Sequence, residues 1–211
     1  KFEECGLHQN GFDICQPKKS DGPYLYKNEM YLPRAYFVDN SVLVLGNNAD
    51  NLVFFILLNE NFNPSNTMII SDDSLEKIDI GFLRKFKFVI LTETPKNGDA
   101  LKLKAYADNG GMIMPDIFAG QTQLSESKVN EVLSSFNSDY SGLRKANIRY
   151  NSFDSATMSI NQDGFLVLSE QYSMYPGWKA AINGKELQIF RADNAISAVH
   201  INGERGDLIL E

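Results

Sequence analysis

The hydrophobic and polar positions change their period twice along the chain. Residues 1–41 carry short apolar runs of the kind found in strands, with the turn pair Asn10-Gly11 between two of them. Between 42 and 141, short strand-like runs alternate with longer segments whose apolar residues recur at helical spacing. From 142 onward the strand-like runs return. Alternating strands and helices are typical of a parallel sheet, so the middle of the chain and its two ends predict different architectures.

The pattern predicts a mixed fold that combines an α/β part with an all-β part. We expect the two ends, 1–41 and 142–211, to build one β-sandwich of the jelly-roll type, and 42–141 to form an inserted three-layer α/β domain. Gly110-Gly111 follows the third expected helix and supplies the left-handed residue that ends it. The expected strands of the insert are 42–46, 67–71, 88–92 and 111–115, and its expected helices are 49–60, 80–86, 98–109 and 125–136.

One hairpin is predicted in residue detail. Asn183-Gly184 is a turn pair that favours positive φ, and a two-residue turn there would pair Trp178 with Ile189. In this register the ring of Trp178, the single tryptophan of the chain, points into the core. Burial is the favoured use of a ring of that size, so we expect a structural role for Trp178.

Two tyrosines lie in the bend that precedes this hairpin. Tyr172 and Tyr175 have amphipathic rings and are placed on a loop, where binding residues are common. They are therefore better candidates than Trp178 for contacting a sugar ring.

Charge and hydropathy narrow the class of partner. The formal net charge is −7 and the pI is about 4.9, which argues against nucleic acid because phosphate binding needs clustered Lys and Arg. The longest apolar run, 52–58, is far shorter than the roughly 20 residues that a helix needs to cross a bilayer. The chain begins at Lys1 without a methionine and ends within a strand-like run, and we interpret it as a piece of a longer protein.

The two cysteines, Cys5 and Cys15, flank the hairpin signal at Asn10-Gly11. A two-residue turn would place them on opposite faces of the hairpin, whereas a three-residue loop with a bulge would set them directly opposite each other. Only the second register allows a disulfide bond, so a bridge and two free thiols stay open as alternatives.

The sequence contains no complete catalytic motif. The nucleophile-elbow patterns G-x-S-x-G and G-x-C-x-G do not occur, and neither does a P-loop. A dinucleotide site needs several glycines after the first strand of the α/β part, and only Gly46 is present there. The two histidines, His8 and His200, lie far apart without metal-ligand spacing, which is typical of ordinary surface or edge-strand residues. The sequence therefore predicts no cofactor and no nucleophilic catalysis.

Carboxylates follow three of the expected parallel strands. Asp72 and Asp73 come after the second strand, Glu93 after the third and Asp116 after the fourth. Ligands bind at the carboxyl ends of parallel strands, so Asp72, Glu93 and Asp116 could together hold Ca²⁺ or Mg²⁺, or hydrogen-bond a polyol. The same residue types also cap the helices that follow such turns, and capping is the favoured interpretation.

Residues near the two ends of the chain match a known pattern. They are Tyr26, Asn28, Leu32, Pro33, Arg34, Ala35, Tyr175, Pro176, Gly177, Trp178, Asn183, Gly184, Lys185, Arg191 and Ala192. They lie in two segments, 23–38 and 164–201, which resemble the extracytoplasmic C-terminal region of YfhO-like membrane proteins, large polytopic proteins related to lipid-linked-sugar glycosyltransferases. Asn183 stands where an aspartate is common, and both residues suit the turn. The segment 87–116 is similar to the glutamine-amidotransferase-like α/β fold but lacks its nucleophile.

The resemblance implies a noncatalytic soluble domain outside the cytoplasm, tethered to the transmembrane portion of the same protein. The catalytic acids of such proteins are expected in the membrane-embedded part. The implied role is to bind or position a glycan or a lipid-linked sugar, and its candidate contacts are Tyr172, Tyr175 and Arg191. Structural roles are expected for Pro33, Trp178, Asn183 and Gly184.

Two alternatives belong to other classes of protein. The insert could be a small metal-dependent hydrolase that uses Asp72, Glu93 and Asp116. The chain could also be a purely architectural domain that packs on its membrane partner through exposed apolar patches.

Overall fold

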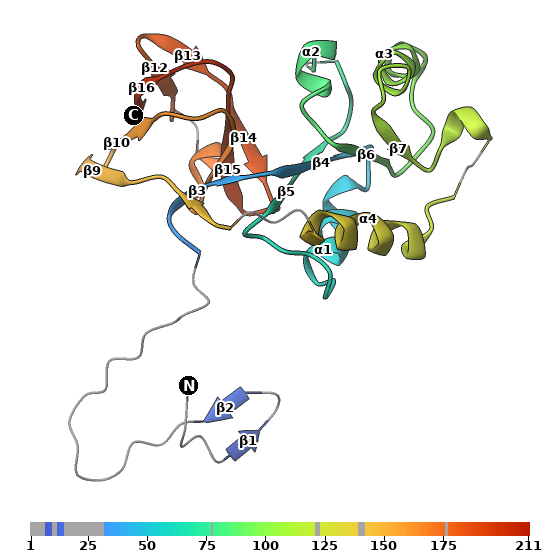
Figure 1. Cartoon of the computed structure of the whole chain (residues 1–211), viewed down its shortest axis with the longest axis horizontal. Coiled ribbons are helices and arrows are strands. Elements are labelled where there is room, and N and C mark those ends of the chain that lie inside the picture. Colours follow the sequence, from blue (N-terminus) through green and yellow to red (C-terminus); the bar gives the residue numbers. More distant parts are fainter. Residues whose placement is uncertain are drawn as a thin grey trace. The chain divides into compact units, whose positions relative to one another are not determined.

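The computed structural model describes residues 7–9, 12–14, 32–76, 78–120, 123–138, 142–175 and 177–211. They form two units, an N-terminal hairpin and a compact body that begins at Leu32 (Figure 1). The hairpin consists of β1 (Leu7–Gln9) and β2 (Phe12–Ile14), and Gln9 pairs with Phe12. Cys5 and Cys15 lie outside the described residues, so both alternatives for them stay predictions.

In the described part of the body, two β-sheets are combined with four α-helices. A nine-stranded sheet has the order β7-β6-β4-β5-β14-β15-β11-β3-β8, and a five-stranded sheet has the order β13-β12-β16-β10-β9. The strands of the first are β3 (Ala35–Val38), β4 (Asn40–Leu45), β5 (Thr67–Asp72), β6 (Phe88–Leu91), β7 (Met112–Met114), β8 (Arg144–Lys145), β11 (Gly164–Leu168), β14 (Ile189–Ala192) and β15 (Ile196–Ile201). Those of the second are β9 (Ile148–Ser152), β10 (Ser155–Ile160), β12 (Ala180–Ile182), β13 (Lys185–Leu187) and β16 (Gly206–Leu210). The helices are α1 (Ala49–Leu57), α2 (Ile80–Leu83), α3 (Asn97–Ala107) and α4 (Glu126–Ser138), with 3-10 turns η1 (Ile117–Ala119) and η2 (Tyr172–Met174).

The strands β7, β6, β4 and β5 run parallel and carry helices on both faces (Figure 1). On one face, Val53 of α1 and Leu133 of α4 share a core with Val44 of β4. On the other face, Leu103 of α3 packs in one core with Leu43 of β4, and α2 lies beside it. The run Val42–Leu45 of β4 and the strand β6 are buried on both faces, and there the sequence is continuously apolar rather than alternating.

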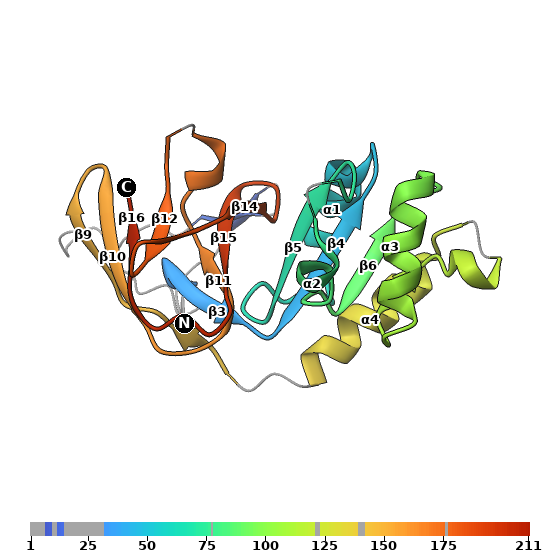
Figure 2. The ribbon, with the colours of Figure 1, turned by 90° about the horizontal axis from the view of Figure 1, so that it is seen from above.

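The other half of the nine-stranded sheet is antiparallel and packs against the five-stranded sheet (Figure 2). Phe37 of β3, Leu166 of β11 and Val199 of β15 share one buried cluster with Met158 of β10 and Leu208 of β16. Two sheets therefore cover one another over a common apolar core, as in proteins built from packed β-layers.

A single seam joins the parallel and antiparallel halves of the nine-stranded sheet. At this seam Ala192 of β14 pairs with Ile70 of β5. The mixed α/β and β class is confirmed, and a helix lies at each of the four places expected between 42 and 141. The division into a domain of 1–41 with 142–211 and an insert of 42–141 stays a prediction; one sheet runs through both described parts.

The hairpin at Asn183-Gly184 has the expected turn, with φ of 51° and 78° at its two central residues. Ala180 pairs with Leu187 as the two-residue turn requires, but the expected pairing of Trp178 with Ile189 is wrong. The chain leaves the hairpin after Leu187, and Ile189 begins β14, which pairs with β15 in the other sheet. A strand that changes sheets makes a corner, and period-two alternation within the hairpin cannot reveal it.

None of the helices in the described residues combines the length and the apolar character that crossing a bilayer requires.

Candidate functional site

A pocket lies beside the β9–β10 hairpin, in the half of the body where the two sheets pack on each other. Its volume is about 680 Å³, within the ~300 to 1,000 Å³ that is usual for small-molecule sites. Three segments far apart in sequence build it: the residue before β3, the β9–β10 hairpin, and the loop after β11 that contains η2. This aromatic pocket is lined by Arg34, Tyr150, Asn151, Ser152, Phe153, Ser155, Glu170, Gln171, Tyr172, Tyr175 and Trp178.

The β9–β10 hairpin forms one rim of the aromatic pocket. Ser152 pairs with Ser155 across a two-residue turn, and the hydroxyl of Ser152 donates to the carboxylate of Asp154 in that turn. Phe153 at the tip is fully exposed, and Tyr150 is 44% exposed. Large exposed rings gathered beside a pocket are typical of a binding surface.

Tyr172 and Trp178 form the inner wall of the pocket. Their ring centroids are 4.5 Å apart at an interplanar angle of 59°. Tyr172 is buried, and burial raises the pKa of its hydroxyl well above the ordinary value, so the group stays neutral. Trp178 is partly buried against the core between the sheets and also lines the pocket, while Tyr175 at the mouth is 61% exposed. The wall therefore offers aromatic surface from the floor to the rim.

A closed triangle of hydrogen bonds supplies the polar side of the pocket. Arg34 Nη1 donates to the hydroxyl of Tyr150 at 3.1 Å and to Glu170 Oε1 at 3.2 Å, and the Tyr150 hydroxyl donates to the same oxygen at 3.1 Å. The guanidinium carbon of Arg34 also lies 5.3 Å from the centroid of the Tyr150 ring. These contacts, first the hydrogen bond with Tyr150, raise the pKa of Arg34. Paired charges of opposite sign give the pocket donors and acceptors without a net charge.

The structure brings together two of the three residues that the sequence nominated for glycan binding. Tyr172 and Tyr175 share the aromatic pocket, whereas Arg191 of β14 donates to Asp50 of α1 and, at 3.3 Å, to the hydroxyl of Ser71. Arg191 therefore links β14 to the parallel part of the sheet. The sequence prediction did not propose as glycan contacts the two charged lining residues, Arg34 and Glu170, or the two rings of the β9–β10 hairpin, Tyr150 and Phe153.

The three carboxylates that the sequence analysis proposed as a metal site, Asp72, Glu93 and Asp116, all accept hydrogen bonds. For Asp72 and Asp116 the donors lie in the turn that follows the residue, and for Glu93 they lie in a neighbouring loop. Asp72 Oδ1 accepts from the backbone N–H of Ser74 at 3.2 Å, and Asp116 Oδ1 accepts from that of Phe118 at 3.1 Å. Glu93 instead accepts from Asn47. Across the described ranges, no three His, Cys, Asp or Glu side chains are grouped so that they could hold a metal ion.

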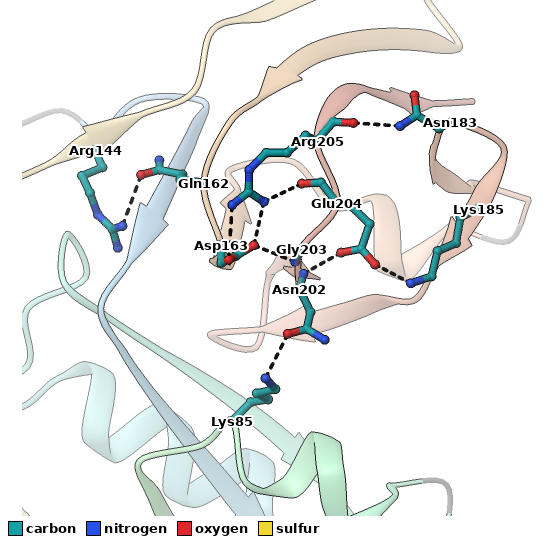
Figure 3. Close-up of polar contacts among 10 residues, drawn as sticks. All are labelled: Lys85, Arg144, Gln162, Asp163, Asn183, Lys185, Asn202, Gly203, Glu204 and Arg205. Atoms are coloured by element: carbon teal, nitrogen blue, oxygen red, sulfur yellow. Dashed lines mark hydrogen bonds and ion pairs between the residues drawn. The ribbon is translucent and has the colours of Figure 1, made fainter.

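A second polar cluster joins three turns of the chain: β10–β11, β12–β13 and β15–β16 (Figure 3). The carboxylate of Asp163 accepts from Arg205 Nη1 at 2.8 Å and from Arg205 Nη2 at 3.3 Å, and this bidentate pair lowers the pKa of Asp163 to about 2. Asn183 Nδ2 donates to the carbonyl of Arg205 at 2.8 Å, and Lys185 pairs with Glu204. The hairpin turn at Asn183 is thereby tied to the β15–β16 turn, which is a structural role.

Pro33 and His200 also lie in well-packed surroundings. Pro33 is buried, and its carbonyl accepts from the hydroxyl of Ser169 at 2.9 Å. His200 packs on the rings of Phe165 and Phe82, with centroid distances of 4.7 and 5.7 Å, and burial, followed by the charge of Lys85, lowers its pKa. His8 lies in β1 of the N-terminal hairpin.

Comparison with known proteins gives no match, either to a protein-family model or to a curated protein. The fold and the pocket define the class of the protein as mixed α/β and β, with an aromatic pocket beside the five-stranded sheet.

Proposed function

We propose that this chain is a carbohydrate-binding domain without catalytic activity, and that its aromatic pocket holds a glycan. The observation that supports the proposal best is the gathering of Tyr172, Tyr175 and Trp178 in one pocket with the Arg34–Glu170 pair. A sugar ring has an apolar face of C–H groups and an edge of hydroxyls. The C–H face can pack on aromatic rings, and the hydroxyl edge can hydrogen-bond to a set of donors and acceptors that carries no net charge.

The shape and charge of the pocket favour a neutral glycan. Arg34 is neutralised by Glu170, so an acidic sugar would gain little from the guanidinium. The pocket is open to solvent, and two of the rings that line it, Phe153 and Tyr175, are exposed. An extended chain of sugars can therefore lie across the mouth with one residue in the pocket.

We further propose that the domain is the extracytoplasmic part of a YfhO-like membrane protein, tethered to a transmembrane portion that carries the glycosyltransferase chemistry. In this proposal the two packed sheets are a β-sandwich of the jelly-roll type and the parallel part is a nucleophile-less amidotransferase-like lobe. The proposal is supported because the two segments that resemble YfhO-like proteins also contain residues that line the aromatic pocket. The resembling segments 23–38 and 164–201 supply Arg34, Glu170, Tyr172, Tyr175 and Trp178 of the pocket. The ligand would then be a glycan or a lipid-linked sugar.

A glycan array of neutral and acidic sugars, followed by calorimetry with the best ligand, tests the proposal. We expect binding of at least one neutral glycan and a loss of about fivefold or more in affinity in Tyr175→Ala, because one aromatic contact is worth about 1 kcal/mol or more. Phe118→Ala is the matched control, since Phe118 is an exposed ring, 46% accessible, outside the pocket. Absence of glycan binding, or equal affinity of Tyr175→Ala and the unaltered protein, contradicts the proposal.

The metal-dependent hydrolase alternative has less support. Asp72 and Asp116 each bond to the backbone of the turn that follows them, as capping residues do.

A further inference from the structure

A second pocket lies in the parallel part of the sheet, at the carboxyl ends of β4, β6 and β7. Its volume is about 460 Å³, again within the ~300 to 1,000 Å³ of small-molecule sites. We call it the strand-end pocket. It is lined by Asn48, Asn51, Leu52, Phe55, Leu91, Thr92, Glu93, Thr94, Pro115, Ile117, Gly120 and Leu124.

The strand order explains why a pocket forms at this place. The chain leaves β4 into α1 on one face of the sheet and leaves β6 toward α3 on the opposite face (Figure 1). β4 and β6 are neighbours, so their two following loops diverge and leave a crevice between them. Such topological switch points are the usual ligand sites of open parallel sheets.

Glu93 is held in place at one side of the crevice. Its Oε2 accepts from Asn47 Nδ2 at 3.0 Å, and its Oε1 accepts from the backbone N–H of Asn47 at 3.3 Å. Gly46, with φ of 121°, lets the two loops touch, because a Cβ there would overlap the hydroxyl oxygen of Thr92. The carboxylate is therefore oriented before any ligand arrives, which lowers the cost of ordering it.

The charges around the strand-end pocket favour a cation. Among the described residues that line it, none is Lys, Arg or His, and Glu93 is the charged one. The small recess on the far side of Glu93 adds Asp73 and Asp99 against Lys96 alone. The positive end of the α1 dipole is opposed by Asp50 in the first turn of that helix, although Asp50 is itself paired with Arg191 and so adds little negative charge to the pocket. A phosphate or carboxylate ligand would find no cationic side chain here.

The opposite wall is apolar and accessible. It is made by Leu52 and Phe55 of α1 together with Ile117 and Leu124, and the ring of Phe55 is 69% exposed. A ligand that covers this ring removes apolar surface from water. We propose that the strand-end pocket binds a small organic cation, in which an ammonium group pairs with Glu93 and an apolar body covers Phe55. This site is separate from the aromatic pocket and does not depend on glycan binding.

Three probes of similar shape and different charge test the proposal: phenethylamine, phenethyl alcohol and hydrocinnamate. Each is titrated into the ¹⁵N-labelled chain, and backbone amide shifts are followed by NMR. We expect phenethylamine to shift the amides of Asn48, Asn51 and 92–94 with millimolar affinity. The alcohol should bind about tenfold more weakly or worse, because its hydroxyl is a neutral donor, whereas the ammonium group makes a charge-assisted hydrogen bond with the carboxylate of Glu93.

Two variants test separately how much the carboxylate of Glu93 and the ring of Phe55 contribute to binding. Glu93→Gln should weaken phenethylamine about tenfold and weaken the alcohol less, because the glutamine keeps an acceptor oxygen but no charge, and Phe55→Ser should weaken both. Glu60→Gln is the matched control, an exposed carboxylate outside the pocket. The amide spectrum of each variant reports whether it is folded, and Phe55→Ser tests the site even if Glu93→Gln does not fold. The proposal is overturned if hydrocinnamate binds as tightly as phenethylamine, if no probe binds, if the shifts fall elsewhere, or if a folded Glu93→Gln keeps its affinity.

Discussion

The carboxylate of Asp193 accepts a hydrogen bond from the backbone N–H of Ile69 at 2.8 Å, and the N–H of Asp193 donates to the carbonyl of Ile69, also at 2.8 Å. These residues lie 124 positions apart in the chain. Their contact continues the pairing of β5 with β14, where the parallel and antiparallel halves of the nine-stranded sheet meet. Burial of the Asp193 carboxyl raises its pKa to about 7.

Asp193 should make folding stability fall as pH rises through neutrality. Its folded pKa of about 7 lies above the ordinary value of ~3.9, so its contribution is complete below about pH 4 and is lost as pH rises through 7. Asparagine keeps an acceptor for Ile69 and tolerates the φ of 48°, but it carries no charge. We expect Asp193→Asn to match the unaltered protein near about pH 4 and to unfold at a higher temperature near about pH 8.

Thermal unfolding followed by circular dichroism across this pH range measures the Asp193 effect. The cost at high pH is bounded by about 1.4 kcal/mol for each unit by which the pKa is raised. A difference in Tm between Asp193→Asn and the unaltered protein that stays constant with pH would show that Asp193 does not titrate in this range.

Asp163 should show the opposite dependence on pH. Arg205 and the backbone N–H of Gly203 lower its folded pKa to about 2, so its stabilising contribution is present above about pH 4 and is lost as pH falls through 2. Asp163→Asn should therefore lower Tm at neutral pH and have little effect near about pH 2. Because the pair is exposed, the effect should shrink in high salt, and a Tm loss that ignores both salt and pH would refute this account.

The local elements of the fold could be predicted from the sequence because local residues determine them. Gly110 has the left-handed φ, 87°, that ends a helix, and Asn183-Gly184 makes the two-residue turn that this pair favours. The pairing partner of each strand could not be predicted from local residues in the same way. Ile189 continues the alternation of the hairpin, and nothing in that alternation shows that it pairs with Val199 in another sheet.

The aromatic pocket could be predicted only in part for the same reason. Tyr172 and Tyr175 are visible in sequence as tyrosines on one loop before Trp178. Arg34 and Glu170 are ordinary charged residues until the pairing of β3 with β11 brings their neighbourhoods together. A site built from distant segments leaves no spacing that a single sequence can reveal, whereas the carboxylates after parallel strands do follow a spacing rule.

Gly46 should be sensitive to substitution because two constraints coincide there. Its φ of 121° lies in a region that side chains disfavour, and an added Cβ would overlap Thr92. We expect Gly46→Ala to lower the free energy of unfolding by roughly 2 kcal/mol or more. Gly98 of α3 is the matched control: no atom lies within 4 Å of its added Cβ, and Gly98→Ala should be neutral or stabilise by about 0.5 to 1 kcal/mol. Chemical denaturation of both variants gives the comparison, and equal losses would remove the case for Gly46.

Arg34 should matter more for glycan affinity than for stability. Its ion pair with Glu170 is exposed, with side-chain exposures of 64% and 38%, and such pairs contribute about 0 to 1 kcal/mol to folding. In the proposed complex the same guanidinium donates to sugar hydroxyls, and a hydrogen bond to a charged group is worth about 1.5 to 3 kcal/mol. Arg34→Met should therefore leave Tm nearly unchanged while weakening the best array glycan by about tenfold or more. Arg149→Met is the control, because Arg149 is exposed on β9 outside the pocket lining. If Arg34→Met instead lowers Tm markedly and leaves calorimetric affinity unaltered, Arg34 is part of the scaffold and not of the glycan site.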